Sequence, residues 1–231
     1  MLIAGHQKLT LIDYPGRIAT TVFTAGCNFR CPFCHNPELV SGIDMSVGRK
    51  AEKEFFEYLK KRKGKIEGVC ITGGEPTIQK DIVEFIRKVN DAGYLVKLDT
   101  NGLRPDVIKK LLDLKLIDFI AMDIKNQLDR YDETVGVKVD KERIRLSVEL
   151  IMRSGINYEF RTTAVPGIHT EEDFLEIAKW IRGAKSYYLQ NYREGRILDE
   201  KLKLKTKGKT LDLARIKDLM KDAVDKIGIR G

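Results

Sequence analysis

The chain has 231 residues, of which 42% are hydrophobic and 33% are charged. This length and apolar content suffice for one compact core, so we predict a single domain over residues 1–231. Its strands and helices should occupy about 17–195, and a C-terminal extension should follow at about 196–231. No apolar run approaches the roughly 20 residues of a membrane helix, and residues 1–10 lack the order of a signal peptide. These features exclude a membrane protein and predict a cytoplasmic one.

Lys and Arg outnumber Asp and Glu by 42 to 34, which gives a net charge of +8. Such a surplus attracts anions, including nucleic acids. The basic residues are nevertheless mixed with Glu and Asp, and the densest stretch, Lys201 to Lys209, contains no aromatic residue that could stack on a base. We therefore expect a solvated basic surface without specific binding of nucleic acid or membrane.

Short β-branched or apolar runs alternate with helical patterns along the chain. Six runs predict strands, in this order: Ala19 to Ala25, Gly68 to Thr72, Leu95 to Asp99, Phe119 to Asp123, Tyr158 to Thr163, and Ser186 to Gln190.

The segments between these runs carry apolar residues on one helical face. The positions are Ile82, Phe85, Ile86 and Val89; Val107, Ile108, Leu111 and Leu112; and Ile144, Val148 and Ile151. Pro105 suits a first helical position, and Thr170 with Asp173 has the spacing of a capping box. Gly93, Gly155 and Gly183 follow helical runs, where a left-handed cap is favoured. A final amphipathic helix is predicted from Leu213, Ile216, Met220, Ala223 and Ile227.

Strands joined by single helices imply parallel pairing with right-handed crossovers, so the fold class is α/β, as an open sheet or a barrel. Six strand–helix units are fewer than the eight of a closed barrel. A partial (β/α)6 barrel followed by a C-terminal amphipathic helix fits the count.

Three of the four cysteines, Cys27, Cys31 and Cys34, follow the first predicted strand with the spacing CxxxCxxC. Three thiolates can hold three irons of a [4Fe-4S] cube and leave the fourth iron open to a substrate. Structural zinc would need a fourth ligand, which His35 is poorly placed to supply. The segment 31–35 also matches the CxxCH of haem attachment and the CxxC of a thioredoxin-like pair, but neither explains Cys27. The fourth cysteine, Cys70, lies in an apolar run, which is typical of a small buried side chain.

Polar residues follow the other predicted strands, at the edge where parallel α/β folds carry their sites. In Thr72-Gly73-Gly74-Glu75-Pro76, two glycines allow a ligand to approach the backbone, and the Glu75 carboxylate can accept hydrogen bonds from an ammonium group. The remaining strand ends contribute Asp99, Thr100 and Asn101; Met122, Asp123 and Lys125; Arg161; and Gln190 with Asn191.

The sequence resembles the radical S-adenosylmethionine (SAM) superfamily through CNFRCPFC at 27–34 and GGEP at 73–76. Within it, the chain is similar to glycyl-radical-enzyme activating enzymes through CHNP at 34–37, DYPG at 13–16, DTNG at 99–102 and MDIK at 122–125. LIDYPG at 11–16 and RTTAVPG at 161–167 make it most similar to activators of anaerobic ribonucleoside-triphosphate reductase, with the pyruvate formate-lyase activators as near relatives.

This resemblance implies a role for each motif. Cys27, Cys31 and Cys34 would ligate the [4Fe-4S] cluster, whose open iron would bind SAM. The residues implied to contact SAM are Phe33, Gly73, Gly74, Glu75, Asp99, Asn101, Asp123, Lys125, Arg161 and Gln190; Gly73, Gly74 and Glu75 would hold the amino end, and Lys125 the carboxylate. A monovalent cation, Na⁺ or K⁺, would be held by Asp99, Thr100, Met122 and Asp123.

The implied activity is reductive cleavage of SAM to methionine and a 5′-deoxyadenosyl radical, followed by formation of a glycyl radical on a partner enzyme. The implied partners are anaerobic ribonucleoside-triphosphate reductase and a flavodoxin or ferredoxin-type reductant. Two alternatives are a radical SAM enzyme that acts on a small molecule or a peptide, and a non-catalytic iron–sulfur electron carrier.

Overall fold

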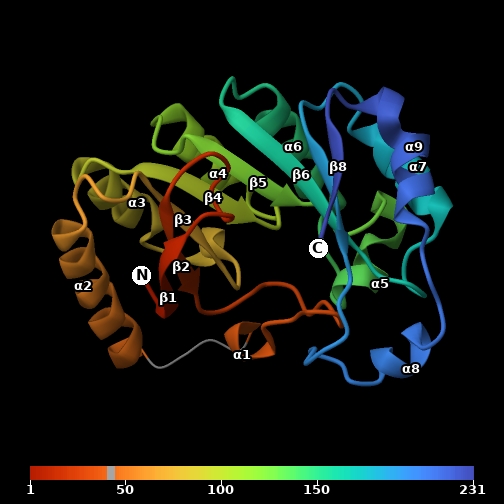
Figure 1. Cartoon of the computed structure of the whole chain (residues 1–231), viewed down its shortest axis with the longest axis horizontal. Helices are drawn as coiled ribbons and strands as arrows, with labels where there is room; N and C mark the ends of the chain where they lie inside the picture. The colour runs from red at the N-terminus through yellow and green to blue at the C-terminus, as the bar shows by residue number, and fades with distance from the viewer. Residues whose placement is uncertain (41–44) are drawn as a thin grey trace. The chain divides into compact units, whose positions relative to one another are not determined.

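The computed structural model of the chain describes residues 1–40 and 45–231 (Figure 1). Its strands form a mixed, mostly parallel sheet in which strand order follows chain order from β1 to β8. The chain divides into two compact units. Unit 1 comprises Met1–Asn28, Glu38–Thr100 and Arg104–Ile120, and unit 2 comprises Phe29–Pro37, Asn101–Leu103 and Ala121–Gly231. A single domain stays a prediction.

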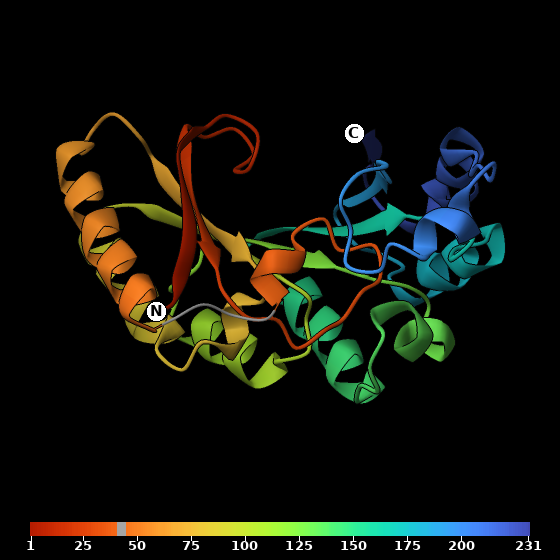
Figure 2. The same cartoon turned by 90° about the horizontal axis from the view of Figure 1, so that it is seen from below.

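The described residues of unit 1 include the strands β1 (Ile3–Thr10), β2 (Ala19–Thr24), β3 (Gly68–Gly73) and β4 (Leu95–Thr100). β2, β3 and β4 are parallel, because the helices α2 (Met45–Lys61) and α3 (Ile82–Asp91) carry the chain back between them. β1 pairs antiparallel with β2. The shorter elements are α1 (Pro37–Val40), η1 (Pro76–Ile78) and α4 (Pro105–Asp113). Figure 2 shows α3 and α4 on one face of these strands.

β5 (Phe119–Asp123) begins in unit 1 and ends in unit 2. The strands β6 (Asn157–Ala164), β7 (Tyr187–Asn191) and β8 (Ile227–Arg230) of unit 2 are parallel. Its helical elements are η2 (Leu128–Arg130), α5 (Tyr131–Val135), α6 (Lys141–Met152), α7 (Glu171–Trp180), α8 (Leu202–Thr206), α9 (Leu213–Met220) and η3 (Lys221–Ala223). α7 and α9 lie side by side (Figure 1), joined by the Arg215–Glu171 ion pair at 3.0 Å.

Several predicted helix ends are confirmed. Thr170 and Asp173 form a capping box at the start of α7, and Pro105 begins α4. Gly93, Gly155 and Gly183 all have positive φ angles, between 78° and 88°. The capping box satisfies backbone groups in the first turn of α7, and the Gly93 amide donates to the Asn90 carbonyl at 2.8 Å at the end of α3.

The predicted extent of the last helix is wrong. α9 ends at Met220, and Ile227 begins the strand β8, where it pairs with Tyr187. The spacing of apolar residues does not distinguish a helix from a short strand here. Pairing with β7 determines that Ile227 belongs to a strand. Gly228 favours the strand, because a Cβ at that position would lie 2.8 Å from the Tyr188 ring. β1 was not predicted either. Its HQK segment is polar, and the strand is defined by its antiparallel pairing with β2.

The core of unit 1 lies on the helix-covered face of β2, β3 and β4. Alternation along the strands brings Val22, Ile71 and Leu98 into one row, and Val69 and Val96 into another. The buried side chains of unit 2 include Ile144, Val148, Phe160, Phe174, Ile177, Tyr187 and Leu189.

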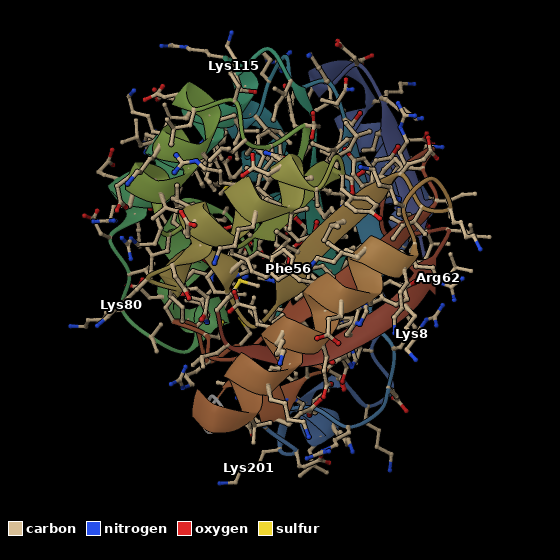
Figure 3. All side chains as sticks on the ribbon, turned by 90° about the vertical axis from the view of Figure 1, so that its left-hand side faces the viewer. Lys8, Phe56, Arg62, Lys80, Lys115 and Lys201 are labelled. Carbon is tan, nitrogen blue, oxygen red and sulfur yellow. The ribbon has the colours of Figure 1, made fainter. Side chains whose placement is uncertain are left out.

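Exposed lysines account for the basic surface. Figure 3 shows Lys80, Lys115 and Lys201 pointing away from the ribbon, as predicted for a solvated surface. Within residues 1–40 and 45–231, no helix has the length and apolar character needed to cross a membrane.

Candidate functional site

The Gly73-Gly74-Glu75 loop of unit 1 is hydrogen-bonded to the end of β2, next to Cys27. The amide of Gly74 donates to the Thr24 carbonyl at 2.9 Å, and the amide of Glu75 donates to the Gly26 carbonyl at 2.8 Å. The Cys27 amide in turn donates to the Val40 carbonyl at 3.3 Å. The glycine loop and the first cysteine are therefore fixed to the same strand end.

The Glu75 carboxylate is 1% exposed and ordered by hydroxyl groups. Its Oε1 accepts hydrogen bonds from the Thr77 amide at 3.0 Å, from the Thr77 hydroxyl, and from the Thr100 hydroxyl at 2.7 Å. Three hydrogen bonds to one oxygen fix the position of this carboxylate, and a carboxylate can accept hydrogen bonds from an ammonium group.

Gly74 has no room for a side chain. A Cβ at this position would lie 2.0 Å from the Gly26 carbonyl oxygen, a backbone atom two residues beyond the end of β2. We expect Gly74→Ala to lower the free energy of unfolding by about 1 to 3 kcal/mol, because the loop must separate from β2. Denaturant unfolding measures this loss. Gly195→Ala is the control, since a Cβ there meets no atom within 4 Å. Equal stability of the two variants would contradict the tight docking.

The cysteine loop is divided between the units, with Cys27 in unit 1 and Cys31 and Cys34 in unit 2. Within unit 2, a turn brings Cys34 back so that its amide donates to the Cys31 carbonyl at 3.0 Å. The loop is anchored there by two backbone hydrogen bonds, from Arg30 to the Val135 carbonyl at 2.8 Å and from the Asp199 amide to the Pro32 carbonyl at 3.0 Å.

None of the four cysteines, all within the described residues, forms a disulfide. Those residues contain no group of three His, Cys, Asp or Glu side chains that converges on a single metal ion. A cubane cluster does not require such convergence, because each thiolate binds a different iron. The three-thiol donor set in a backbone-anchored loop fits a [4Fe-4S] cluster, which stays a prediction.

Asp123, at the end of β5, is bound by two cationic side chains of unit 2. Its Oδ1 accepts from Nε of Arg161 at 2.9 Å, and its Oδ2 accepts from Nζ of Lys125 at 3.1 Å. Burial by itself would raise the pKa of Asp123, but the charges of Arg161 and Lys125 outweigh burial and hold that pKa well below its ordinary value. The carboxylate is thus ionised throughout the neutral range.

Lys125 is also fixed through its backbone. Its amide donates to the Tyr131 hydroxyl at 3.2 Å, and its carbonyl pairs with Nε2 of His169 at 2.8 Å. Burial would lower the pKa of Lys125, but the charges of Asp123 and Cys31 raise it, so the ammonium stays protonated. Lys125 is therefore held as an ammonium group beside Asp123.

His169 was not predicted as a site residue. It is 3% exposed, and its Nδ1 accepts from the Val165 amide at 3.0 Å, which leaves Nε2 as the donor to Lys125. Burial lowers the pKa of His169, so the ring is neutral. The ring also lies 6.4 Å from that of Phe33, edge to face. In the sequence, the signal that could have indicated a role for His169 is its place shortly after the RTTAVPG motif.

The other predicted residues of unit 2 have distinct surroundings. Asn101 is 6% exposed and accepts from the Leu103 amide at 3.1 Å. Met122 is fully buried, and a Cβ at Gly102 would lie 2.1 Å from its Cε. Gln190 is partly exposed on β7, paired in register with Thr163 and Arg230. Asn101 and Met122 thus pack within unit 2, while Gln190 remains accessible.

A second carboxylate, Glu159, extends the charge network of unit 2 and was not among the predicted site residues. It is 2% exposed and accepts two hydrogen bonds from Arg230, both at 2.8 Å, while Nη1 of Arg161 lies 3.9 Å away. The Arg230 guanidinium is stacked 3.4 Å from the centroid of the Tyr188 ring. The short strand β8 therefore supplies the partner of a buried charge beside Arg161.

Removal of Arg230 should destabilise unit 2. We expect Arg230→Met to lower the free energy of unfolding by about 1 to 3 kcal/mol, because the remaining cation near Glu159, among the residues that the structure describes, is Arg161 at 3.9 Å. The matched control is Arg215→Met, which removes an exposed arginine from its ion pair with Glu171. Chemical denaturation compares the two, and a loss no larger than that of the control would contradict the structural role of the Arg230 pair.

These features define a class of protein, an α/β chain with a CxxxCxxC motif, in which the first cysteine of the motif, Cys27, and a Gly-Gly-Glu loop are fixed to one strand end. The family model of the radical SAM superfamily matches residues 21–181, more than half of the chain. The chain belongs to the radical SAM superfamily, and it is a radical SAM enzyme.

The similarity to known proteins extends over the whole chain. It is 34% identical over 236 residues to a protein of Methanocaldococcus jannaschii named, provisionally, as a glycyl-radical enzyme activating enzyme, with 99% of this chain and 95% of that protein covered. It is 26% identical over 195 residues to the pyruvate formate-lyase-activating enzyme of Streptococcus mutans, with 80% and 73% covered.

Two solved structures share the fold. SuiB of Streptococcus suis, bound to S-adenosylmethionine, matches with a TM-score of 0.65 and 18% identity over 89% of this chain; the match spans 48% of SuiB, about half its length. TYW1 with a lysine-pyruvate adduct matches with a TM-score of 0.58 and 20% identity over 88% of this chain and 72% of TYW1. These likenesses confirm the predicted α/β partial barrel.

Superfamily membership implies a [4Fe-4S] cluster and SAM as cofactors. It does not imply a monovalent cation. The two carboxylates predicted to bind one, those of Asp99 and Asp123, each have a cationic side chain of the protein as a partner. Asp123 is paired with Lys125 and Arg161, and Asp99 accepts a hydrogen bond from Lys97.

Proposed function

We propose that this chain activates a glycyl-radical enzyme, and that its partner is an anaerobic ribonucleoside-triphosphate reductase. The observation that carries the proposal is the end-to-end similarity to the Methanocaldococcus jannaschii relative. The motifs LIDYPG and RTTAVPG support the finer assignment of the partner. Besides Cys27, Cys31 and Cys34, the sequence contains only Cys70, which is too few for the auxiliary clusters of larger radical SAM enzymes.

Each half of the proposed site has a separate task. Cys27, Cys31 and Cys34 would hold the cluster, and the ordered Glu75 carboxylate would receive the amino group of SAM. Lys125, kept protonated beside Asp123, would face the SAM carboxylate. The buried side chains of Phe33 and Met122 would help to exclude water.

When bound, these cofactors supply a 5′-deoxyadenosyl radical that can take the Cα hydrogen atom of a glycine on the partner. The task of the protein is then positioning, since it must admit one C–H bond and exclude solvent. A flavodoxin or ferredoxin-type protein is the proposed source of the electron.

The test is anaerobic activation of a purified partner. The reconstituted and reduced enzyme is mixed with SAM and an anaerobic ribonucleoside-triphosphate reductase, and electron paramagnetic resonance is recorded. We expect the doublet of a glycyl radical, and no doublet when the partner carries Ala at its radical glycine.

A doublet with pyruvate formate-lyase but not with the reductase would contradict the proposed partner and retain the activase. Formation of 5′-deoxyadenosine without a doublet on either enzyme would contradict the activase and favour a small molecule or peptide as substrate.

A further inference from the structure

A lysine is buried in the middle of strand β4 in unit 1. Lys97 is 1% exposed, between Val96 and Leu98, whose side chains belong to the helix-covered core on the opposite face. A buried ammonium loses its hydration and is retained only where partners compensate the charge. Such a residue breaks the apolar pattern of a strand, and violations of this kind concentrate at functional sites.

The partners of Lys97 follow from the strand register. Cys70 of β3 pairs in register with Lys97, and Asp99 lies two residues further along β4, so all three side chains are on one face of the sheet. Nζ of Lys97 donates to Oδ1 of Asp99, and it lies 3.7 Å from Sγ of Cys70. It also lies 5.9 Å from the centroid of the Phe119 ring.

These neighbours form a site for a positive charge. A carboxylate oxygen, a polarisable sulfur and an aromatic ring each stabilise a cation, and the ion pair is shielded, since the Asp99 side chain is only 12% exposed. The Lys97 ammonium group is thus a positive charge of the protein itself beside Asp99. The resemblance assigns Asp99 to the binding of a Na⁺ or K⁺ ion.

The second carboxylate assigned to that ion is also compensated. Within unit 2, Asp123 has salt bridges of 3.1 Å to Lys125 and 2.9 Å to Arg161. The hydroxyl of Thr100, a third assigned ligand, donates to Glu75 in unit 1. In each unit, therefore, cationic side chains of the protein already compensate the carboxylate that a bound ion would neutralise.

We propose that Lys97 is a resident cation of the cofactor site, and that its ammonium group removes any requirement for Na⁺ or K⁺ in binding SAM. This inference rests on the proposed SAM site, but it does not depend on which partner receives the radical. Lys97 acts as a positioning residue, since it fixes the Asp99 carboxylate rather than the reacting atoms.

The test is calorimetric titration of SAM into the anaerobically reconstituted enzyme, with tetramethylammonium, Na⁺ or K⁺ as the cation. For the wild type, we expect dissociation constants that agree within about twofold in the three salts. For Lys97→Met, we expect binding weakened about tenfold or more in tetramethylammonium, because Asp99 loses its ion pair with Lys97, and recovery in Na⁺ or K⁺. Lys109→Met is the control, because that lysine is exposed on α4 of the same unit.

A second measurement needs no cofactor. The thermal midpoint of the Lys97→Met protein without its iron–sulfur cluster should rise when K⁺ replaces tetramethylammonium, whereas the wild-type midpoint should not respond. Wild-type SAM binding that strengthens tenfold with K⁺, or a Lys97→Met protein insensitive to the cation in both measurements, would overturn the proposal. Cation-independent SAM cleavage without a glycyl doublet on either candidate partner would instead support Lys97 and contradict the activase.

Discussion

Replacing Cys31 with Ala should abolish the iron–sulfur cluster and all cleavage of SAM. The cluster has three thiolates as its only predicted protein ligands, so the loss of one leaves two irons without a ligand from the protein. Anaerobic reconstitution followed by iron and sulfide analysis measures the first effect, and chromatographic detection of 5′-deoxyadenosine measures the second. We expect iron far below the wild-type content and product at the level of the blank.

The fourth cysteine supplies the control. Cys70 lies in the middle of β3 with its Sγ 3.7 Å from Nζ of Lys97, away from the CxxxCxxC loop in the sequence. Cys70→Ala should therefore bind as much iron as the wild type. A Cys31→Ala protein with a full cluster and normal product would refute the ligand assignment, and His35 would then be the first residue to test as a substitute ligand.

Asp123→Asn should have the second largest effect. The substitution removes the carboxylate that compensates Arg161 and Lys125, whose side chains are 14% and 17% exposed. Buried cations without a counter-charge are costly, so we expect the free energy of unfolding to fall by about 2 to 4 kcal/mol, discounted because Asp123 itself is 29% exposed. Denaturant unfolding of the metal-free protein measures this loss. Asp113→Asn, which removes an exposed ion pair with Lys109 on α4, should have no measurable effect.

The lowered pKa of Asp123 predicts that the free energy of unfolding depends on pH. Because the pKa of Asp123 is lower in the folded protein than in the unfolded chain, its stabilising contribution is complete above about pH 4 and declines as the pH falls below that value. The difference in unfolding free energy between the wild type and Asp123→Asn should therefore shrink on acidification from pH 5 to about pH 3. A difference that grows over this range would contradict the assigned direction of the pKa shift.

Prediction from sequence worked where the signal is local. The six predicted strands correspond to β2 through β7, because apolar runs separated by helical segments leave few other topologies. The capping box of α7 is encoded by two residues three positions apart, Thr170 and Asp173. CxxxCxxC and GGEP are likewise contiguous, and the superfamily that they indicated is the one to which the chain belongs.

Prediction failed where the signal depends on a distant partner. β1 and β8 were missed because a short or polar strand is defined by the strand that it pairs with, not by its own composition. The burial of Lys97 could not be inferred from the sequence of β4, where it is a single polar residue between Val96 and Leu98. His169 and Arg230 were missed for the same reason, since Lys125 and Glu159, their partners, are 44 and 71 residues away in the sequence.

The sequence by itself determined the class of chemistry, because cluster ligation and the glycine loop depend on residues that are neighbours along the chain. Only the tertiary structure decided how the charges of each unit are compensated, with Lys97 on Asp99, Lys125 and Arg161 on Asp123, and Arg230 on Glu159. The physical reason is that a buried charge is stable only against a particular partner, and strand register and chain crossovers determine which partner it meets.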